Sequence, residues 1–105
     1  MKAPVKGTIK VLSGNVTSAH AVLLCRPDVV AAYPITPQSE VVEELSKFRA
    51  DGLLQAVFVE VEGEHSAMSV LIGASSAGGR TFSATSSHGL AYMFEAYLYA
   101  ASLRL

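Results

Sequence analysis

The sequence predicts an α/β fold in which a parallel sheet is flanked by helices. Four short apolar runs, each followed by a segment with helical spacing, alternate along the 105 residues. This alternation, with short connections, is typical of parallel strands joined by crossover helices. Half of the residues are hydrophobic and only 16% are charged. For so short a chain, we expect much of this apolar surface to be buried against other polypeptide.

The elements follow from the positions of apolar residues and turn-forming residues. The predicted strands cover residues 8–12, 29–32, 57–61 and 81–84. They are followed by a helix through Ala19, Val22 and Leu23, and by helices over residues 37–49, 64–77 and 89–103. The last helical pattern runs to residue 105 with neither a cap nor a stop signal, so we expect an incomplete domain.

The Tyr-Pro-Ile-Thr-Pro motif at residues 33–37 is the most informative stretch. It joins a strand that reads as buried to a helix that is predicted to begin near Pro37. The two prolines stiffen the loop, which makes a rigid corner at the carboxyl end of a strand. Ligands of open α/β sheets bind at such places. Thr36 either presents its hydroxyl to a ligand or only caps the helix, and the motif alone leaves both open.

Each predicted strand ends in polar or turn-forming residues. These ends are Ser13-Gly14-Asn15 and the segments 33–36, 60–64 and 85–88. Because parallel strands place their carboxyl ends at one edge of a sheet, we expect the four loops to converge on one site.

Three carboxylates surround the third strand end. Alternation puts Glu60 and Glu62 on the same face of the strand, and Glu64 begins the next helix, where the helix dipole favours a carboxylate. Carboxylates so close together are expected to raise one another's pKa, which suits acid–base chemistry. The alternative is that Glu60 and Glu62 are solvated or salt-bridged and Glu64 only caps the helix. For Glu60 and Glu62 we favour that alternative.

Several functions find no support in the sequence. The three histidines, His20, His65 and His88, lack metal-ligand spacing, and neither a phosphate-binding glycine loop nor a nucleophile elbow is present. A net charge of −1 gives no electrostatic case for nucleic acid or an anionic membrane. The least polar stretch, residues 66–79, is shorter than the roughly 20 residues that cross a bilayer.

The single cysteine, Cys25, excludes an internal disulfide and any iron–sulfur cluster held by this chain alone. We expect it to be a small core residue of the first helix rather than a nucleophile. Residues 1–10 are polar and basic and do not resemble a signal peptide, so a reducing cytoplasmic location is predicted.

Taken together, these motifs closely resemble the N-terminal part of the α subunit of 2-oxoacid:ferredoxin oxidoreductases of the pyruvate and phenylglyoxylate type. The resemblance covers residues 14–105 in order and spacing. It is carried by Gly14-Asn15, the motif at residues 33–37 with Ser39-Glu40 and a Val-Glu-Glu-Leu helix, Glu62-Gly63-Glu64 leading to Ile72-Gly73-Ala74-Ser75, and Thr85-Ser86-Ser87-His88-Gly89-Leu90.

The resemblance implies that residues 1–105 are the N-terminal part of the pyrimidine-binding domain of a thiamine diphosphate enzyme. It assigns Glu64 as the catalytic carboxylate that hydrogen-bonds N1′ of the aminopyrimidine. It also makes Thr36 the substrate-binding hydroxyl, within a corner that includes Pro34 and Ile35. Ser87, His88 and Gly89 fall in a cofactor-binding loop. His88 stands where other members carry Pro or Gln, so no acid–base role is inherited.

The implied activity is oxidative decarboxylation of a 2-oxoacid to an acyl-CoA and CO2, with electrons passed to iron–sulfur clusters. The resemblance places the diphosphate and Mg²⁺ on another subunit and the [4Fe-4S] clusters on an iron–sulfur subunit, with coenzyme A and ferredoxin or another acceptor as further partners. A substrate-binding arginine is expected beyond residue 105, so this piece is predicted to be inactive alone. The alternatives are a non-oxidative thiamine diphosphate-dependent decarboxylase subunit and a non-catalytic subunit-interface module.

Overall fold

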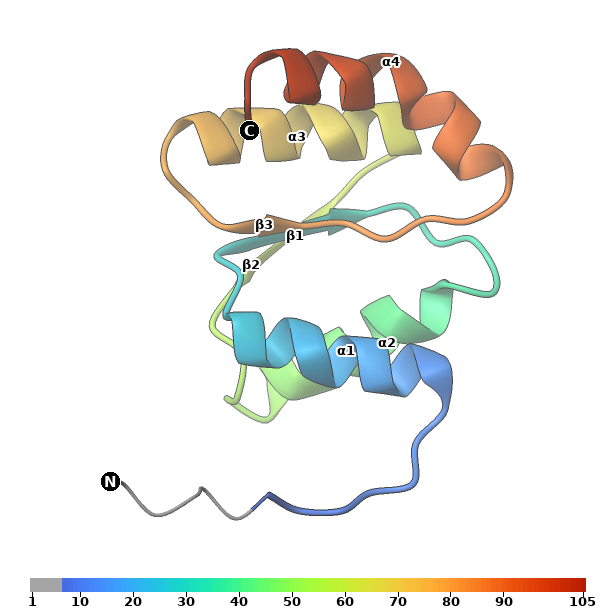
Figure 1. Cartoon of the computed structure of the whole chain (residues 1–105), viewed down its shortest axis with the longest axis vertical. Helices are drawn as coiled ribbons and strands as arrows, with labels where there is room; N and C mark the ends of the chain where they lie inside the picture. Colours follow the sequence, from blue (N-terminus) through green and yellow to red (C-terminus); the bar gives the residue numbers. More distant parts are fainter. Residues whose placement is uncertain (1–6) are drawn as a thin grey trace.

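The computed structural model describes residues 7–105 and shows a sheet between two layers of helices (Figure 1). The strands are β1 (Val29–Ala32), β2 (Val57–Glu60) and β3 (Thr81–Phe82). The helices are α1 (Gly14–Cys25), α2 (Ser39–Ala50), α3 (Glu64–Ser76) and α4 (His88–Ser102). Helices α1 and α2 cover one face of the sheet, whereas α3 covers the other face and α4 packs on α3. The predicted fold class is confirmed.

The sheet has the order β2-β1-β3, and both strand pairs are parallel. β1 occupies the centre because its side chains are apolar on both faces. Val30 is 2% exposed and Ala31 is fully buried. Such continuous apolar sequence is expected of a parallel strand that is covered on both sides.

The two faces of the sheet have separate cores. The larger core lies against α1 and α2, and its buried members are Ala19, Val30, Val41, Leu45, Phe48, Leu54 and Ala56. The smaller core lies against α3 and contains Ala31, Ala67 and Leu71. In β2 the predicted alternation is confirmed, because Phe58 packs against the larger core and Val59 against the smaller one.

Two predicted boundaries differ from the structure by two residues, and the other predicted ends of the elements that form differ by one residue at most. The second helix begins at Ser39 rather than near Pro37, because residues 36–38 form a turn before it. The N-cap residue is therefore Gln38, and the interpretation of Thr36 as an N-cap is wrong. The predicted fourth strand covers residues 81–84, but only Thr81 and Phe82 pair with β1.

The first predicted strand is absent. Residues 8–12 are neither strand nor helix, and Ile9 and Val11 are 98% and 100% exposed. β-Branched residues favour an extended chain, but a strand also needs a neighbour to accept its hydrogen bonds, and this segment has none among the described residues. Residues 1–6, included in the predicted domain 1–105 and in the signal-peptide argument, lie outside the described part of the chain.

The placement of Cys25 in the core is also wrong, because the side chain is exposed. Cys25 is the last residue of α1, and the preceding Leu24 is 81% exposed. The end of this helix thus extends past the core that holds Ala19.

Candidate functional site

The candidate site lies at the edge of the sheet where the strands end. β1 is followed by the corner at residues 33–37, β2 by residues 61–63 and β3 by residues 83–87. The strands are parallel, so these three loops share one edge. The fourth predicted loop joins them from the start of α1, since Asn15 Nδ2 donates to the Pro37 carbonyl at 2.7 Å. The predicted convergence is confirmed, although residues 7–13 form no strand before this loop.

The corner at residues 33–37 is held by hydrogen bonds to its carbonyl groups. Gln38 Nε2 donates to the Tyr33 carbonyl at 3.0 Å, and the Gln38 backbone N–H donates to the Ile35 carbonyl at 3.0 Å. Gln38 is 6% exposed, so this amide is part of the folded framework. The result is a corner whose backbone is fixed while the Thr36 side chain remains exposed.

A second set of contacts joins this corner to the start of α1. Asn15 Nδ2 also donates to Glu40 Oε2 at 3.2 Å, and Ser13 Oγ donates to Glu40 Oε1 at 3.3 Å. Ser13 is at the same time the N-cap of α1, because its hydroxyl accepts from the Val16 N–H. Glu40 thus connects the first turns of two helices.

Glu64 is a buried carboxylate at the first position of α3. It is 6% exposed, and the helix N-terminus favours its negative charge. Gly89 lies directly against it, since a Cβ atom at residue 89 would be 2.9 Å from Glu64 Oε1 and 2.0 Å from Thr85 Oγ1. The loops after β2 and β3 therefore bring Glu64, Thr85 and Gly89 together.

This cluster contains polar groups that call for an outside partner. Thr85 Oγ1 is buried and has no hydrogen-bond partner within residues 7–105. The Glu64 carboxylate likewise makes no hydrogen bond to the part of the chain that the structure describes. Buried polar groups normally have hydrogen-bond partners. The neighbouring Glu64 carboxylate and Thr85 hydroxyl lack such partners here, which suits the binding of a polar ligand.

Glu60 and Glu62 do not join this cluster, and both are exposed. The hydroxyl of Ser66 donates to Glu62 Oε1 and lowers the pKa of that carboxyl below its usual value, with a smaller contribution from the residue's own backbone N–H. The expectation that the three carboxylates raise one another's pKa is wrong for Glu62. The solvated interpretation of Glu60 and Glu62 is confirmed.

The predicted cofactor-binding role of the loop that follows β3 stays a prediction. Ser87 and His88 are exposed at the start of α4, and Gly89 is buried against Glu64. Sequence reasoning missed Ser86, whose hydroxyl donates to the Thr36 carbonyl at 2.8 Å and lies 3.3 Å from the Ile35 carbonyl. A serine within a Thr-Ser-Ser run carries no signal that singles it out.

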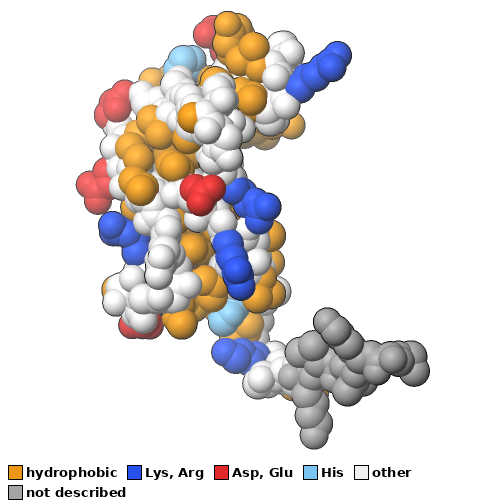
Figure 2. Space-filling view, turned by 90° about the vertical axis from the view of Figure 1, so that its left-hand side faces the viewer, with side chains coloured by type: hydrophobic (Ala, Val, Ile, Leu, Met, Phe, Trp, Pro, Cys, Tyr) orange, Lys and Arg blue, Asp and Glu red, His pale blue; other side chains and the backbone are white. Residues whose placement is uncertain are grey.

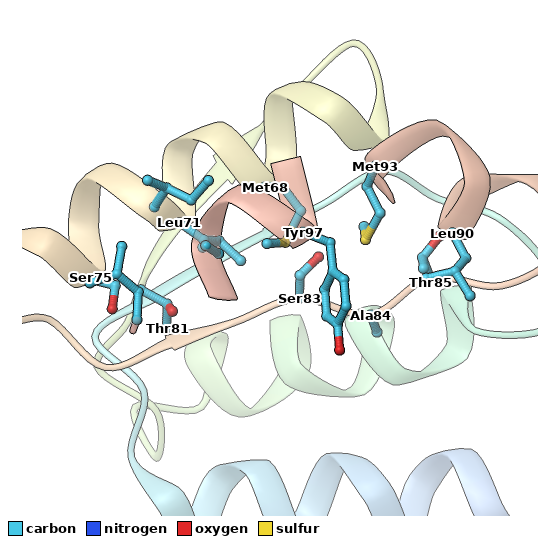
Figure 3. Close-up of a pocket in the computed structure, with 13 residues that line it drawn as sticks. Met68, Leu71, Ser75, Thr81, Ser83, Ala84, Thr85, Leu90, Met93 and Tyr97 are labelled. Carbon is cyan, nitrogen blue, oxygen red and sulfur yellow. The ribbon is translucent and has the colours of Figure 1, made fainter. Parts of the chain in front are cut away.

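A cavity of about 290 Å³ adjoins the cluster beneath α3 and α4 (Figure 3). Its wall is mainly apolar, with Met68, Met93 and Tyr97 facing the loop after β3. Ser83 Oγ is buried there without a partner in the described residues. Thr85 also lines the cavity, which therefore continues from the cluster around Glu64.

Within residues 7–105, no group of three or more His, Cys, Asp or Glu side chains has the arrangement needed to hold a metal ion. No helix in that range has the length and apolar character needed to cross a membrane.

The fold and the site define an α/β ligand-binding domain with a buried carboxylate at the carboxyl edge of its sheet. Residues 20–105 match the family model described as pyruvate flavodoxin/ferredoxin oxidoreductase, thiamine diphosphate-binding, and the chain belongs to this family. The resemblance inferred from the motifs is thereby confirmed.

Characterised relatives support the assignment. The chain is 50% identical over 104 residues to the α subunit of NADH-dependent phenylglyoxylate dehydrogenase from Aromatoleum evansii, covering 99% of this chain and 25% of that protein. It is 54% identical over 96 residues to pyruvate synthase subunit PorA from Methanothermobacter thermautotrophicus, covering 91% of this chain and 25% of that protein. The chain thus spans about a quarter of the length of these relatives.

A solved structure has the same fold. It is the 2-oxoglutarate:ferredoxin oxidoreductase from Magnetococcus marinus with 2-oxoglutarate, coenzyme A and succinyl-CoA bound. The TM-score is 0.71 at 32% sequence identity, over 78% of this chain and 14% of that one.

Proposed function

We propose that this chain supplies the pyrimidine-binding half of a thiamine diphosphate site in a 2-oxoacid:ferredoxin oxidoreductase. The proposed reaction is oxidative decarboxylation of a 2-oxoacid to an acyl-CoA and CO2, with electrons passed to iron–sulfur clusters. The observation that carries the proposal is the buried Glu64 carboxylate, which lies against Gly89 and the unpartnered Thr85 hydroxyl. Family membership supplies the cofactor class.

The residues of the cluster fit the cofactor's aminopyrimidine. Glu64 would hydrogen-bond N1′, and the helix N-terminus keeps this carboxylate available as an acceptor. Gly89 leaves room beside Glu64 that a side chain would fill. The Thr85 hydroxyl offers a further polar contact. When bound, the cofactor supplies the carbon nucleophile and the electron sink of the reaction.

Thr36 is proposed to bind the carboxylate or carbonyl of the 2-oxoacid. Its side chain is exposed, whereas the carbonyls around it are hydrogen-bonded to Gln38, Asn15 and Ser86. A hydroxyl on a backbone fixed in this way is positioned before the substrate arrives, which reduces the entropic cost of binding. Pro34 and Ile35 belong to the same corner, and Ser87 and His88 lie on the loop proposed to border the cofactor.

The remaining parts of the enzyme are proposed to lie outside this chain. They comprise a domain or subunit that holds the diphosphate and Mg²⁺, a subunit with [4Fe-4S] clusters, coenzyme A, and ferredoxin or another electron acceptor. The relatives' names include both pyruvate and phenylglyoxylate, which supports a 2-oxoacid as the substrate class. A cytoplasmic location stays a prediction.

The proposal is tested by Glu64→Gln in the assembled enzyme. Glutamine keeps the size of the side chain but removes the anionic acceptor, so turnover should fall by about 10²–10⁴-fold, a range typical for loss of an acid–base group. Thiamine diphosphate affinity, measured by calorimetry, should weaken as well. Glu60→Gln is the matched control, since Glu60 is exposed and lies outside the cluster. If Glu64→Gln left turnover and cofactor affinity at the control's level, the catalytic assignment would be wrong.

A further inference from the structure

We propose that Ser86 is a positioning residue that fixes the Thr36 corner relative to Glu64; this inference rests on the proposed function. Ser86 is placed to contact neither substrate nor cofactor through its hydroxyl, because that hydroxyl is turned onto the corner's backbone. Its Oγ donates to the Thr36 carbonyl at 2.8 Å, across 50 positions of sequence, with the Ile35 carbonyl 3.3 Å away.

The Thr36 carbonyl depends on this contact. The Tyr33 carbonyl accepts from the Gln38 side chain, and the Pro37 carbonyl accepts from Asn15. The Ile35 carbonyl accepts from the backbone N–H groups of Gln38 and Ser39. Among the described residues, Ser86 alone donates to the carbonyl of Thr36. Removal of the hydroxyl would leave the one peptide group that carries the proposed substrate-binding side chain without its hydrogen bond.

The backbone carbonyl of Ser86 is held close to Glu64 by a second hydrogen bond. The Gly89 N–H donates to the Ser86 carbonyl at 3.0 Å, which closes a four-residue turn over residues 86–89. Gly89 is in turn the residue that packs against the Glu64 carboxylate. A single turn therefore ties the corner that holds Thr36 to the carboxylate proposed to hold the cofactor.

The turn has a strained conformation at its first central residue. Ser87 has φ 52° and ψ −128°, the combination of the first central position in a type II′ turn, where glycine is favoured. A side chain there costs roughly as much as a hydrogen bond contributes, and such strain persists only where the surrounding structure enforces it. The hydrogen bonds of Ser86 and Gly89 hold Ser87 in this conformation. Strained residues are often found at functional sites.

This role predicts a specific kinetic signature. Loss of the Ser86 hydroxyl should loosen the Thr36 corner while leaving Glu64 and Gly89 in place. The Michaelis constant for the 2-oxoacid should therefore rise, whereas the affinity for thiamine diphosphate should stay the same. A merely structural role would lower stability or both binding steps together.

The experiment compares Ser86→Ala, Ser86→Thr and the control Ser76→Ala in the assembled enzyme. Ser76 is an exposed residue of α3 whose hydroxyl bonds only to its own helix. Ser86→Ala should raise the KM for the 2-oxoacid about tenfold, the size expected for a lost hydrogen bond. Its dissociation constant for thiamine diphosphate should stay within about twofold of the wild type. Ser86→Thr retains the hydroxyl and should restore the KM.

A second readout does not depend on catalysis. Hydrogen–deuterium exchange of the amides in residues 33–38 should be faster in Ser86→Ala than in the wild type, and unchanged in Ser76→Ala. Unchanged exchange and KM in Ser86→Ala, or an equal defect in Ser86→Thr, would overturn the role of Ser86. A wild-type complex that does not bind thiamine diphosphate would refute the proposed function instead, and the exchange data would still decide whether Ser86 fixes the corner.

Discussion

Gly89 determines how near the backbone of α4 can come to Glu64. A Cβ atom at this position would lie 2.0 Å from Thr85 Oγ1 and 2.9 Å from Glu64 Oε1, distances that no real packing allows. The first residues of α4 therefore approach the carboxylate only because residue 89 has no side chain. Among the eight glycines of the 105-residue chain, Gly89 is one that any other residue would replace only with a steric clash.

Gly89→Ala should consequently damage both the fold and the site. We expect the free energy of unfolding to fall by about 1–3 kcal/mol, as overpacking typically costs, and thiamine diphosphate affinity in the assembled enzyme to fall as well. Adding Thr85→Ala removes the nearest clash and should recover part of the stability in chemical denaturation.

Gly73→Ala is the control, because a Cβ atom there meets nothing within 4 Å. It replaces a glycine inside α3, where alanine should stabilise the helix by up to about 1 kcal/mol. Equal effects of Gly89→Ala and Gly73→Ala would contradict the close-packing account of Gly89.

A candidate site residue can be predicted from the sequence only where its position depends on residues that are near it along the chain. The position of Glu64 at the start of a helix is predictable because it follows a strand end, whereas its catalytic role comes from the family resemblance and stays a prediction. Ser86 was not predicted, since its contact with Thr36 arises only when two loops 50 positions apart meet. Cys25 was misplaced because hydrophobic spacing does not show where the end of a helix leaves the core.

At the scale of elements, the turn at residues 86–89 sets the start of α4. Its strained residue, Ser87, is also the N-cap of that helix but makes no side-chain capping bond. The serine side chain therefore contributes no capping energy, while its Cβ atom makes the positive φ unfavourable.

Ser87→Gly should relieve this strain and raise the free energy of unfolding by about 1 kcal/mol. Ser87→Ala is the matched comparison, since it removes the same hydroxyl but keeps the Cβ atom, and it should leave stability near the wild-type value. Chemical denaturation of the two variants separates the contributions. A Ser87→Gly protein no more stable than Ser87→Ala would show that the turn is not strained in solution.

Most helices and strands could be predicted because turn-forming residues separate the apolar segments. Val29–Ala32 was predicted with the observed bounds, and the predicted third helix, residues 64–77, differs from α3 by one residue at its end. Residues 8–12 have the same β-branched character as a strand, yet no sheet edge receives them. Strand formation depends on a neighbour that is distant in sequence, so local pattern cannot decide it.

For the whole molecule, the exposed apolar surface is the feature that bears most on assembly. Figure 2 shows hydrophobic side chains spread over the face that it presents. On α4, aromatic and aliphatic side chains are half exposed or more, namely Leu90, Tyr92, Phe94, Tyr97, Leu98 and Tyr99. The prediction that much of this surface is buried against other polypeptide stays a prediction, and it agrees with the proposal that the chain supplies half of a shared site.

The central claim concerns where the cofactor's aminopyrimidine binds, and the most direct measurement is a structure of the assembled enzyme with thiamine diphosphate bound. The account predicts a Glu64 carboxylate oxygen within about 3 Å of N1′, a hydrogen-bonding distance, beside Gly89 and Thr85. A structure in which N1′ contacts a different acidic residue, with Glu64 turned away from the cofactor, would contradict it.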